Sequence, residues 1–239
     1  MIHYLSAACK LVDAFSGAPI QGATILAEPS QKRFLEKGNG LYAISNLESG
    51  TYFFTITAQG YAIQKRRFVV GETEKEFTCF LYPNQSEKSI LLSGSMTQGG
   101  QPLTHTVFYF AIDQVRYRGI LQGETQKGEK QVRFHIYRNE SLEGRRLAIA
   151  RDTATYTLGK FDYLQKQYRM IEQAEKTFTK GSEVYLLFEA QTDSAGKFTL
   201  CLPRYLWETD TLQIIFFLQK KIQKNSINCI NQTNFHVQW

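Results

Sequence analysis

The chain has 239 residues, of which 43% are hydrophobic and 21% charged, a composition typical of a folded protein and not of a disordered one. Its formal net charge is +6, but the basic residues lie in short groups among apolar ones, such as Lys65-Arg66-Arg67, which favours solvated strand faces and no nucleic-acid partner. No segment approaches the run of about 20 apolar residues that a membrane-spanning helix needs, so no membrane span is expected.

The first third of the chain is a series of short apolar segments separated by glycine and proline turns. The clearest segment is Thr51–Ala58, where Tyr52, Phe54 and Ile56 alternate with more polar residues, as in a strand with one buried face. The polar residues 85–89 are expected to form a linker. Strands are predicted at about 7–13, 20–25, 41–44, 51–58, 67–70 and 76–82.

Three glycine-containing motifs in this part of the chain resemble a known family. They are Gly17-x-Pro19-Ile20-x-Gly22-Ala23, Gly40-x-Tyr42, and Leu47-x-x-Gly50-x-Tyr52 followed by Ala58-x-Gly60-Tyr61. Their spacing resembles that of the carboxypeptidase regulatory-like domain. The resemblance covers about residues 5–82, and it implies a seven-stranded, immunoglobulin-like β-sandwich of the transthyretin type.

A weaker copy of the same pattern starts near Ile90. Gly99-Gly100-Gln101-Pro102 repeats the first turn, and Asp193–Phe198 repeats the later one before a strand at Leu212–Leu218. The sequence separation between the turn proline and the later aromatic residue is 23 residues in the first copy and 96 in the second. We therefore predict two tandem sandwich domains, residues 1–84 and 90–239, with an insertion at about 113–190 in the second.

The insertion is expected to contain a hairpin formed by Val132–Tyr137 and Arg146–Ala150. After Asp162, which can cap a helix, the spacing of the apolar residues through Phe178 also allows a helix. So long an insertion is either a binding or assembly surface or an extra sheet that enlarges the core, and both remain open. The candidate interaction surface comprises Tyr156, Phe161, Tyr163, Tyr168 and Arg169.

No recognisable catalytic, cofactor-binding or metal-binding motif occurs in the sequence. None of the four histidines has a partner at metal-ligand spacing, and the four cysteines form no CxxC pair. Cys9 and Cys79 fall in the first and last strands of the first domain; buried reduced thiols are expected there, with a disulfide as the alternative. The prediction is therefore a protein without enzymatic activity, cofactor or metal.

Two kinds of function fit this composition. The first is a structural or adaptor protein that contacts other protein subunits, as a homo- or hetero-oligomer, within a larger assembly such as a phage-tail-like or contractile injection particle. The start of the chain lacks the pattern of an export signal, so this protein is expected in the cytoplasm. The alternative is an exported cell-surface or periplasmic module that binds glycan or protein, which would require a trimmed N-terminus. A small enzyme with a site near Arg151–Tyr168 is a third, weaker alternative.

Overall fold

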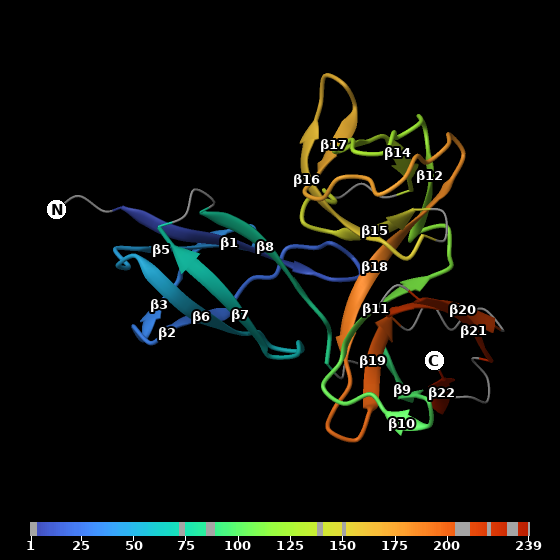
Figure 1. Ribbon diagram of the computed structural model, residues 1–239. Helices are drawn as coiled ribbons and strands as arrows, with labels where there is room; N and C mark the ends of the chain where they lie inside the picture. The colour runs from blue at the N-terminus through green and yellow to red at the C-terminus, as the bar shows by residue number, and fades with distance from the viewer. Residues whose placement is uncertain are drawn as a thin grey trace. The chain divides into compact units, whose positions relative to one another are not determined.

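The computed structural model of the chain describes residues 4–71, 75–84, 89–137, 141–149, 152–203, 211–218, 221–228 and 234–238. Every regular element in these ranges is a β-strand, so the all-β prediction is confirmed. Contacts divide the chain into two compact units, residues 1–89 and 90–239 (Figure 1). Residues 85–88 of the expected linker lie outside the described ranges, as do His3 and Cys229.

The first unit consists of two four-stranded sheets. One has the order β4 (Leu35–Gly38), β5 (Leu41–Ser45), β1 (Leu5–Asp13) and β8 (Glu76–Leu81). The other has the order β3 (Lys32–Arg33), β2 (Thr24–Glu28), β6 (Gly50–Thr57) and β7 (Gln64–Val70). β1 and β8, the first and last strands, pair in parallel, and the other pairs are antiparallel.

The core of the first unit lies between these two sheets. Tyr52, Phe54 and Ile56 of β6 are buried in it, whereas the neighbouring Phe53 is 45% exposed, as the alternation in the sequence predicts. Cys9 and Cys79 are both buried in this core and are not joined in a disulfide, and burial raises the pKa of the Cys9 thiol. The expectation of reduced thiols at these two positions agrees with the structure.

The motif residues of the first unit hold its turns together. Asp13 Oδ1 accepts hydrogen bonds from the backbone N–H groups of Phe15 and Ser16, at 2.9 and 2.7 Å. Its Oδ2 accepts one from the Tyr61 hydroxyl at 3.1 Å. Asp13 therefore fixes the turn that precedes Pro19 and ties it to Tyr61, in the turn that follows β6.

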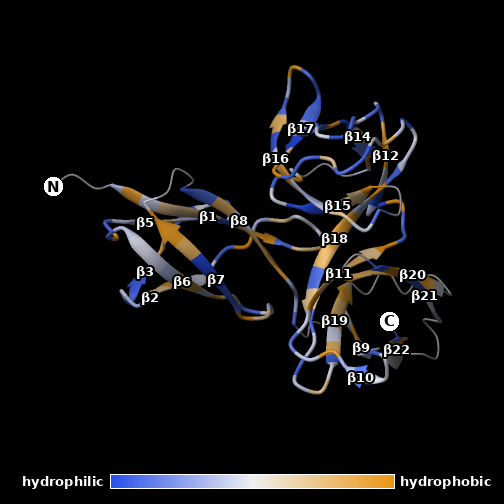
Figure 2. Cartoon of the chain, in the orientation of Figure 1, coloured by the Kyte–Doolittle hydropathy of each residue, from blue (hydrophilic) through white to orange (hydrophobic). Residues whose placement is uncertain are grey.

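The second unit contains a small and a large sheet. The small sheet has the order β10 (Gln101–Pro102), β9 (Ser89–Gln98) and β19 (Lys197–Pro203), with β22 (Asn234–Gln238) paired in parallel to β9. At one end of the large sheet the strand order is β18 (Glu183–Gln191), β11 (Val107–Ile112), β20 (Thr211–Leu218) and β21 (Lys221–Asn228). β18 carries a long hydrophobic run (Figure 2), and all residues of Val184–Phe188 are buried.

One set of backbone contacts occurs in both units. In the first, Leu11 N–H donates to the carbonyl of Gly40 at 2.8 Å, and Ile20 N–H donates to the carbonyl of Leu11 at 3.0 Å. The equivalent bonds in the second unit run from Met96 to Gly196 at 2.8 Å and from Leu103 to Met96 at 3.0 Å. Strands β2, β6 and β7 also pair in the same way as β11, β20 and β21.

The segment between β11 and β18 extends the large sheet. It supplies β12 (Arg118–Leu121), β13 (Gln131–Val132), β14 (Phe134–Ile136), β15 (Arg146–Ile149), β16 (Thr155–Asp162) and β17 (Gln167–Met170). β15 pairs with β18 and β16, β17 pairs with β16 and β13, and β12 pairs with β14 and β18. This segment has a hydrophobic core of its own, which includes Leu147, Tyr156 and Met170.

Two predictions for this segment are wrong. The helix after Asp162 is absent, and a hairpin of β16 and β17 stands in its place. Asp162 Oδ1 accepts the N–H groups of Leu164 and Gln165, at 2.9 and 3.1 Å, in a tight turn that Lys166 completes at φ 53°. The hairpin predicted from Val132–Tyr137 and Arg146–Ala150 is also incorrect, because β14 pairs with β12 and β15 pairs with β16 and β18.

Candidate functional site

The tip of the β16–β17 hairpin carries the two most exposed large hydrophobic side chains of the described residues. Tyr163 is 83% exposed and Leu164 is 96% exposed. Figure 1 shows the hairpin as a gold loop that extends away from the strands around it in the second unit. The Asp162 hydrogen bonds hold both residues in a defined turn, so the tip presents an apolar pair at a fixed place.

Aromatic rings connect this tip to the hydrophobic core of the segment between β11 and β18. Phe134 stacks on Tyr168 with ring centroids 5.6 Å apart, and Tyr168 contacts Phe161 at 4.7 Å. Phe161 in turn meets Tyr163 edge-on at 5.1 Å. We call Phe134, Tyr168, Phe161 and Tyr163 the aromatic ladder. Phe134, Tyr168 and Phe161 are half-buried and Tyr163 is 83% exposed, so a partner at the tip would contact a ring that is packed against half-buried ones.

The structure brings four of the five predicted surface residues together. Phe161, Tyr163 and Tyr168 belong to the ladder, and Arg169 is exposed on β17. Tyr156 is a correction: it is 1% exposed, in the core of the insertion, and its hydroxyl accepts a hydrogen bond from Glu175 N–H at 3.2 Å. Tyr156 therefore positions the hairpin from inside.

The sequence analysis missed Leu164, Lys160 and Lys166 as surface residues. The predicted helix would place Leu164 on its apolar face, yet this side chain is 96% exposed. The Asp-x-x-x-Lys spacing at 162–166 is compatible with a turn as well as with a capped helix. In both structures the aspartate carboxylate accepts hydrogen bonds from the backbone N–H groups that follow it.

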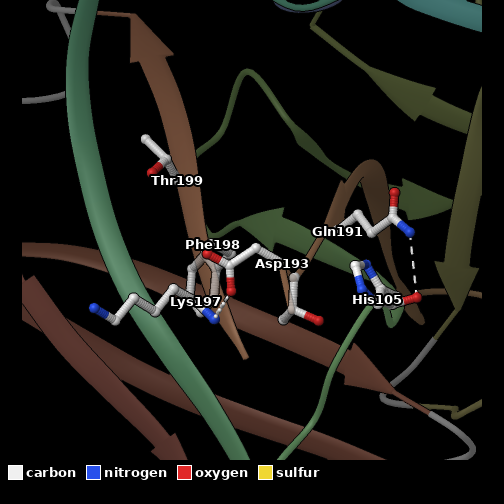
Figure 3. Close-up of a pocket in the computed structure, with 7 residues that line it drawn as sticks. His105, Gln191, Asp193, Lys197, Phe198 and Thr199 are labelled. Carbon is white, nitrogen blue, oxygen red and sulfur yellow. Dashed lines mark hydrogen bonds between the residues drawn. The ribbon is translucent and has the colours of Figure 1, made fainter. Parts of the chain in front are cut away.

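A hollow in the second unit is the other candidate site (Figure 3). It has a volume of about 440 Å³ and lies where the turn after β18 meets the start of β19, with His105, Asp193 and Lys197 in its lining. His105 adopts a left-handed backbone conformation with φ 48°.

Most polar groups around the hollow hold the backbone. Asp193 Oδ1 accepts the N–H groups of Lys197 and Ala195, at 2.9 and 2.8 Å, and these two bonds keep the pKa of Asp193 below its usual value. Thr192 Oγ1 accepts Thr106 N–H at 2.9 Å, and Gln191 Nε2 donates to the carbonyl of His105 at 3.2 Å. These bonds therefore hold the backbone of the turn between β18 and β19 and of the segment around His105.

Two further observations on the described residues concern metal ligands and membrane-spanning helices. In those ranges no group of three or more His, Cys, Asp or Glu side chains is placed to hold a metal ion. No helix in them is both long and apolar enough to cross a bilayer.

The first unit matches a known family. Residues 9–78 match the carboxypeptidase regulatory-like domain. The match spans β1 to most of β8, including Asp13, Gly40 and Tyr61. The regulatory-like resemblance of the sequence is thereby confirmed for this unit, and such a domain is compatible with a binding role without catalysis.

The comparisons with whole proteins are more distant. The Bacillus anthracis TIE protein aligns over 98% of this chain and 50% of its own, with 12% identity and a TM-score of 0.27. Salmonella alpha-2-macroglobulin reacted with methylamine aligns over 94% of this chain and 14% of its own, with 10% identity and a TM-score of 0.18. The chain thus spans half the length or less of these two structures. A comparison with curated proteins finds no match.

Proposed function

We propose that this protein is a non-catalytic adaptor that binds a protein partner through the tip of the β16–β17 hairpin. The observation that carries the proposal is the exposed Tyr163–Leu164 pair at the end of an aromatic ladder. Tyrosine and arginine are enriched at the energetic centres of protein interfaces, and Arg169 lies on the same hairpin. The regulatory-like domain and the turn-holding role of the polar groups in the hollow support a binding role over a catalytic one.

We propose further that residues 90–239 are a second sandwich of the same kind, interrupted by residues 113–182. Two observations support this. The Leu11, Ile20 and Gly40 contacts have counterparts at Met96, Leu103 and Gly196, and the first and last strands are parallel in both units. In this arrangement β11 corresponds to β2 of the first unit. The insertion follows β11 and carries the proposed binding tip.

The partner is proposed to be a subunit of a larger cytoplasmic assembly, with phage-tail-like and contractile injection particles as the fold-level analogy. An exported cell-surface or periplasmic module that binds glycan or protein is the second candidate. Subcellular fractionation separates the two: the adaptor co-sediments with a large cytoplasmic particle, whereas the alternative places the chain outside the cytoplasm.

The binding role is tested by quantitative affinity capture from the native lysate, followed by mass spectrometry. Leu164→Asp places a charge at the tip without touching the core, and Ile63→Asp makes the same change at a 70% exposed site in the first unit. We expect one protein to be recovered with the unaltered chain and with Ile63→Asp, but about tenfold less with Leu164→Asp. Equal recovery with all three chains, or no specific partner with any, would contradict the proposal.

A further inference from the structure

The carboxylates around the hairpin are occupied by neighbouring polar groups of the same chain. Glu172 accepts Thr157 N–H and the Thr157 hydroxyl, at 2.6 and 2.9 Å. Glu129 Oε2 accepts Gln126 N–H at 2.8 Å, and Asp162 Oδ1 holds the tip turn. These three carboxylates therefore hold local backbone structure, and none of them forms an ion pair with a lysine or arginine within the described residues.

Five cations of the same region are exposed and have no carboxylate partner within the described residues. β13 pairs with β17 through Gln131 and Arg169, which places the residues flanking β13 beside the hairpin. Within the described ranges no carboxylate lies at ion-pair distance from any of the exposed side chains of Lys130, Arg133, Lys160, Lys166 and Arg169. We call these five residues the basic collar.

The apolar content of the tip distinguishes between two kinds of acidic surface. Stable binding to a bilayer requires several large aliphatic or tryptophan side chains to insert, since even one buried acyl chain gives only marginal binding. Here one aliphatic side chain, Leu164, and one tyrosine, Tyr163, lie at the apex, and Ile171 is set back at the base of the hairpin. That amount of apolar surface fits a socket on a protein, where an anchor residue fills a pocket and charges surround it.

From this arrangement we infer that the partner bound by the hairpin is an acidic protein surface with a small apolar socket. Leu164 and Tyr163 fill the socket, and the basic collar faces carboxylates at its rim. The inference rests on the proposed function and adds the chemistry of the partner to it. Charge complementarity of this kind speeds association and selects against basic or neutral surfaces.

The test uses the protein captured by the unaltered chain and lost with Leu164→Asp, purified and titrated against the full-length chain by calorimetry. We expect the dissociation constant to rise about tenfold or more between about 50 and about 500 mM salt. A triple charge reversal of the collar should weaken binding at low salt by about tenfold or more, and should remove most of the salt dependence. The matched control makes the same change of net charge at exposed residues of the first unit. The two variants are Lys160→Glu/Lys166→Glu/Arg169→Glu and Lys10→Glu/Arg33→Glu/Lys37→Glu.

The outcomes separate the inference from the proposed function. Binding that requires Leu164 but is indifferent to salt and to the collar reversal leaves the adaptor intact and overturns the acidic socket. An equal effect of the control reversal overturns it too, since net charge alone would explain the loss. A second arm uses vesicles of phosphatidylcholine with about a quarter phosphatidylserine. Sedimentation with these vesicles that Leu164→Asp abolishes would overturn the protein socket in favour of an anionic membrane.

Discussion

At the scale of single residues, a few side chains and glycines define the first unit. Asp13 and Tyr61 lie at the two ends of the glycine-rich pattern, and their hydrogen bond joins the turn after β1 to the end of β6. Gly40 sits where the backbone of the Leu11–Pro19 turn passes closest to β5. These turns can be predicted from the sequence, because glycine and proline favour particular backbone dihedral angles that turns require.

The close approach at Gly40 predicts a specific loss of stability. A Cβ at Gly40 would lie 2.6 Å from the Leu11 carbonyl oxygen, and φ is +71°. Gly38 has φ +90° but nothing within 4 Å of such a Cβ, which makes it a matched control. We expect Gly38→Ala to cost about 1–2 kcal/mol from backbone strain alone, and Gly40→Ala about 3 kcal/mol or more because the backbone must also shift. Chemical denaturation measures both, and equal costs would contradict the role of the close approach.

Tyr61 predicts a pH dependence of stability in the alkaline range. Burial, and then the negative charge of Asp13, raises the pKa of Tyr61 from 10.0 to about 12. Because the folded pKa lies above the unfolded one, this contribution is complete below pH 10.0 and is lost as the pH rises toward 12. The free energy of unfolding should therefore fall less steeply between these pH values in Tyr61→Phe than in the unaltered chain. Identical slopes in denaturation at pH 9 to 12 would rule out this role for Tyr61.

At the scale of elements, the insertion shows where sequence patterns fail. Residues 162–178 have apolar positions at helical spacing and a capping aspartate, yet they form a turn, a strand and irregular segments. Local signals are ambiguous here, because Asp162 makes the same backbone bonds in a turn as at a helix start. Pairing with β13 and β16 then selects the strand, and those partners are distant in sequence. The alternating strand β6 has no such competing pattern and was predicted within one residue at each end.

An ionic network at the base of the insertion is a second element-scale feature. Arg118 Nη1 lies 2.9 Å from Asp113 Oδ1 and 3.4 Å from Glu183 Oε1, and so bridges the residues where the insertion leaves β11 and enters β18. Lys224 Nζ of β21 lies 2.9 Å from Asp113 Oδ2. The Asp113 side chain is only 8% exposed, so its charge is the centre of the network.

Removing that central charge should destabilise the second unit. Asp113→Asn keeps the size of the side chain but leaves Arg118 and Lys224 without their shared carboxylate, at a cost of about 2 kcal/mol. Glu143→Gln, at an exposed residue, removes the same charge elsewhere in the insertion and should cost less than about 0.5 kcal/mol. The comparison is made by chemical denaturation near neutral pH. Equal free energies of unfolding for the two variants would contradict a stabilising role for this network.

At the scale of the whole molecule, the chain divides into two units with separate hydrophobic cores. The prediction of two tandem sandwiches rests on turn motifs, because the contacts around Gly40 and Gly196 depend on residue types that the sequence displays. The chemistry of the binding tip was not predictable in the same way. It depends on which charged side chains have partners within the chain. The hydrogen bonds of Glu129 and Glu172 could not be predicted from the sequence, because they depend on the fold.

The separate core of the first unit predicts that it folds alone. A fragment of residues 1–84 contains every strand from β1 to β8 and all of their sheet partners. We expect it to unfold in one cooperative transition, with a midpoint close to that of the corresponding transition in the full chain. A fragment that lacks a cooperative transition, while the full chain retains one, would show that the first unit depends on the second.

The most direct test of the central claim is site-specific photocrosslinking in the cells that produce this protein. A benzophenone side chain is placed at Leu164 in one version of the chain and at Ile63 in the other, since both positions are exposed in the structure. The account predicts that illumination joins the chain to one defined protein from position 164 and not from position 63. Crosslinks to the same proteins from both positions, or none from position 164, would contradict a binding role for the hairpin tip.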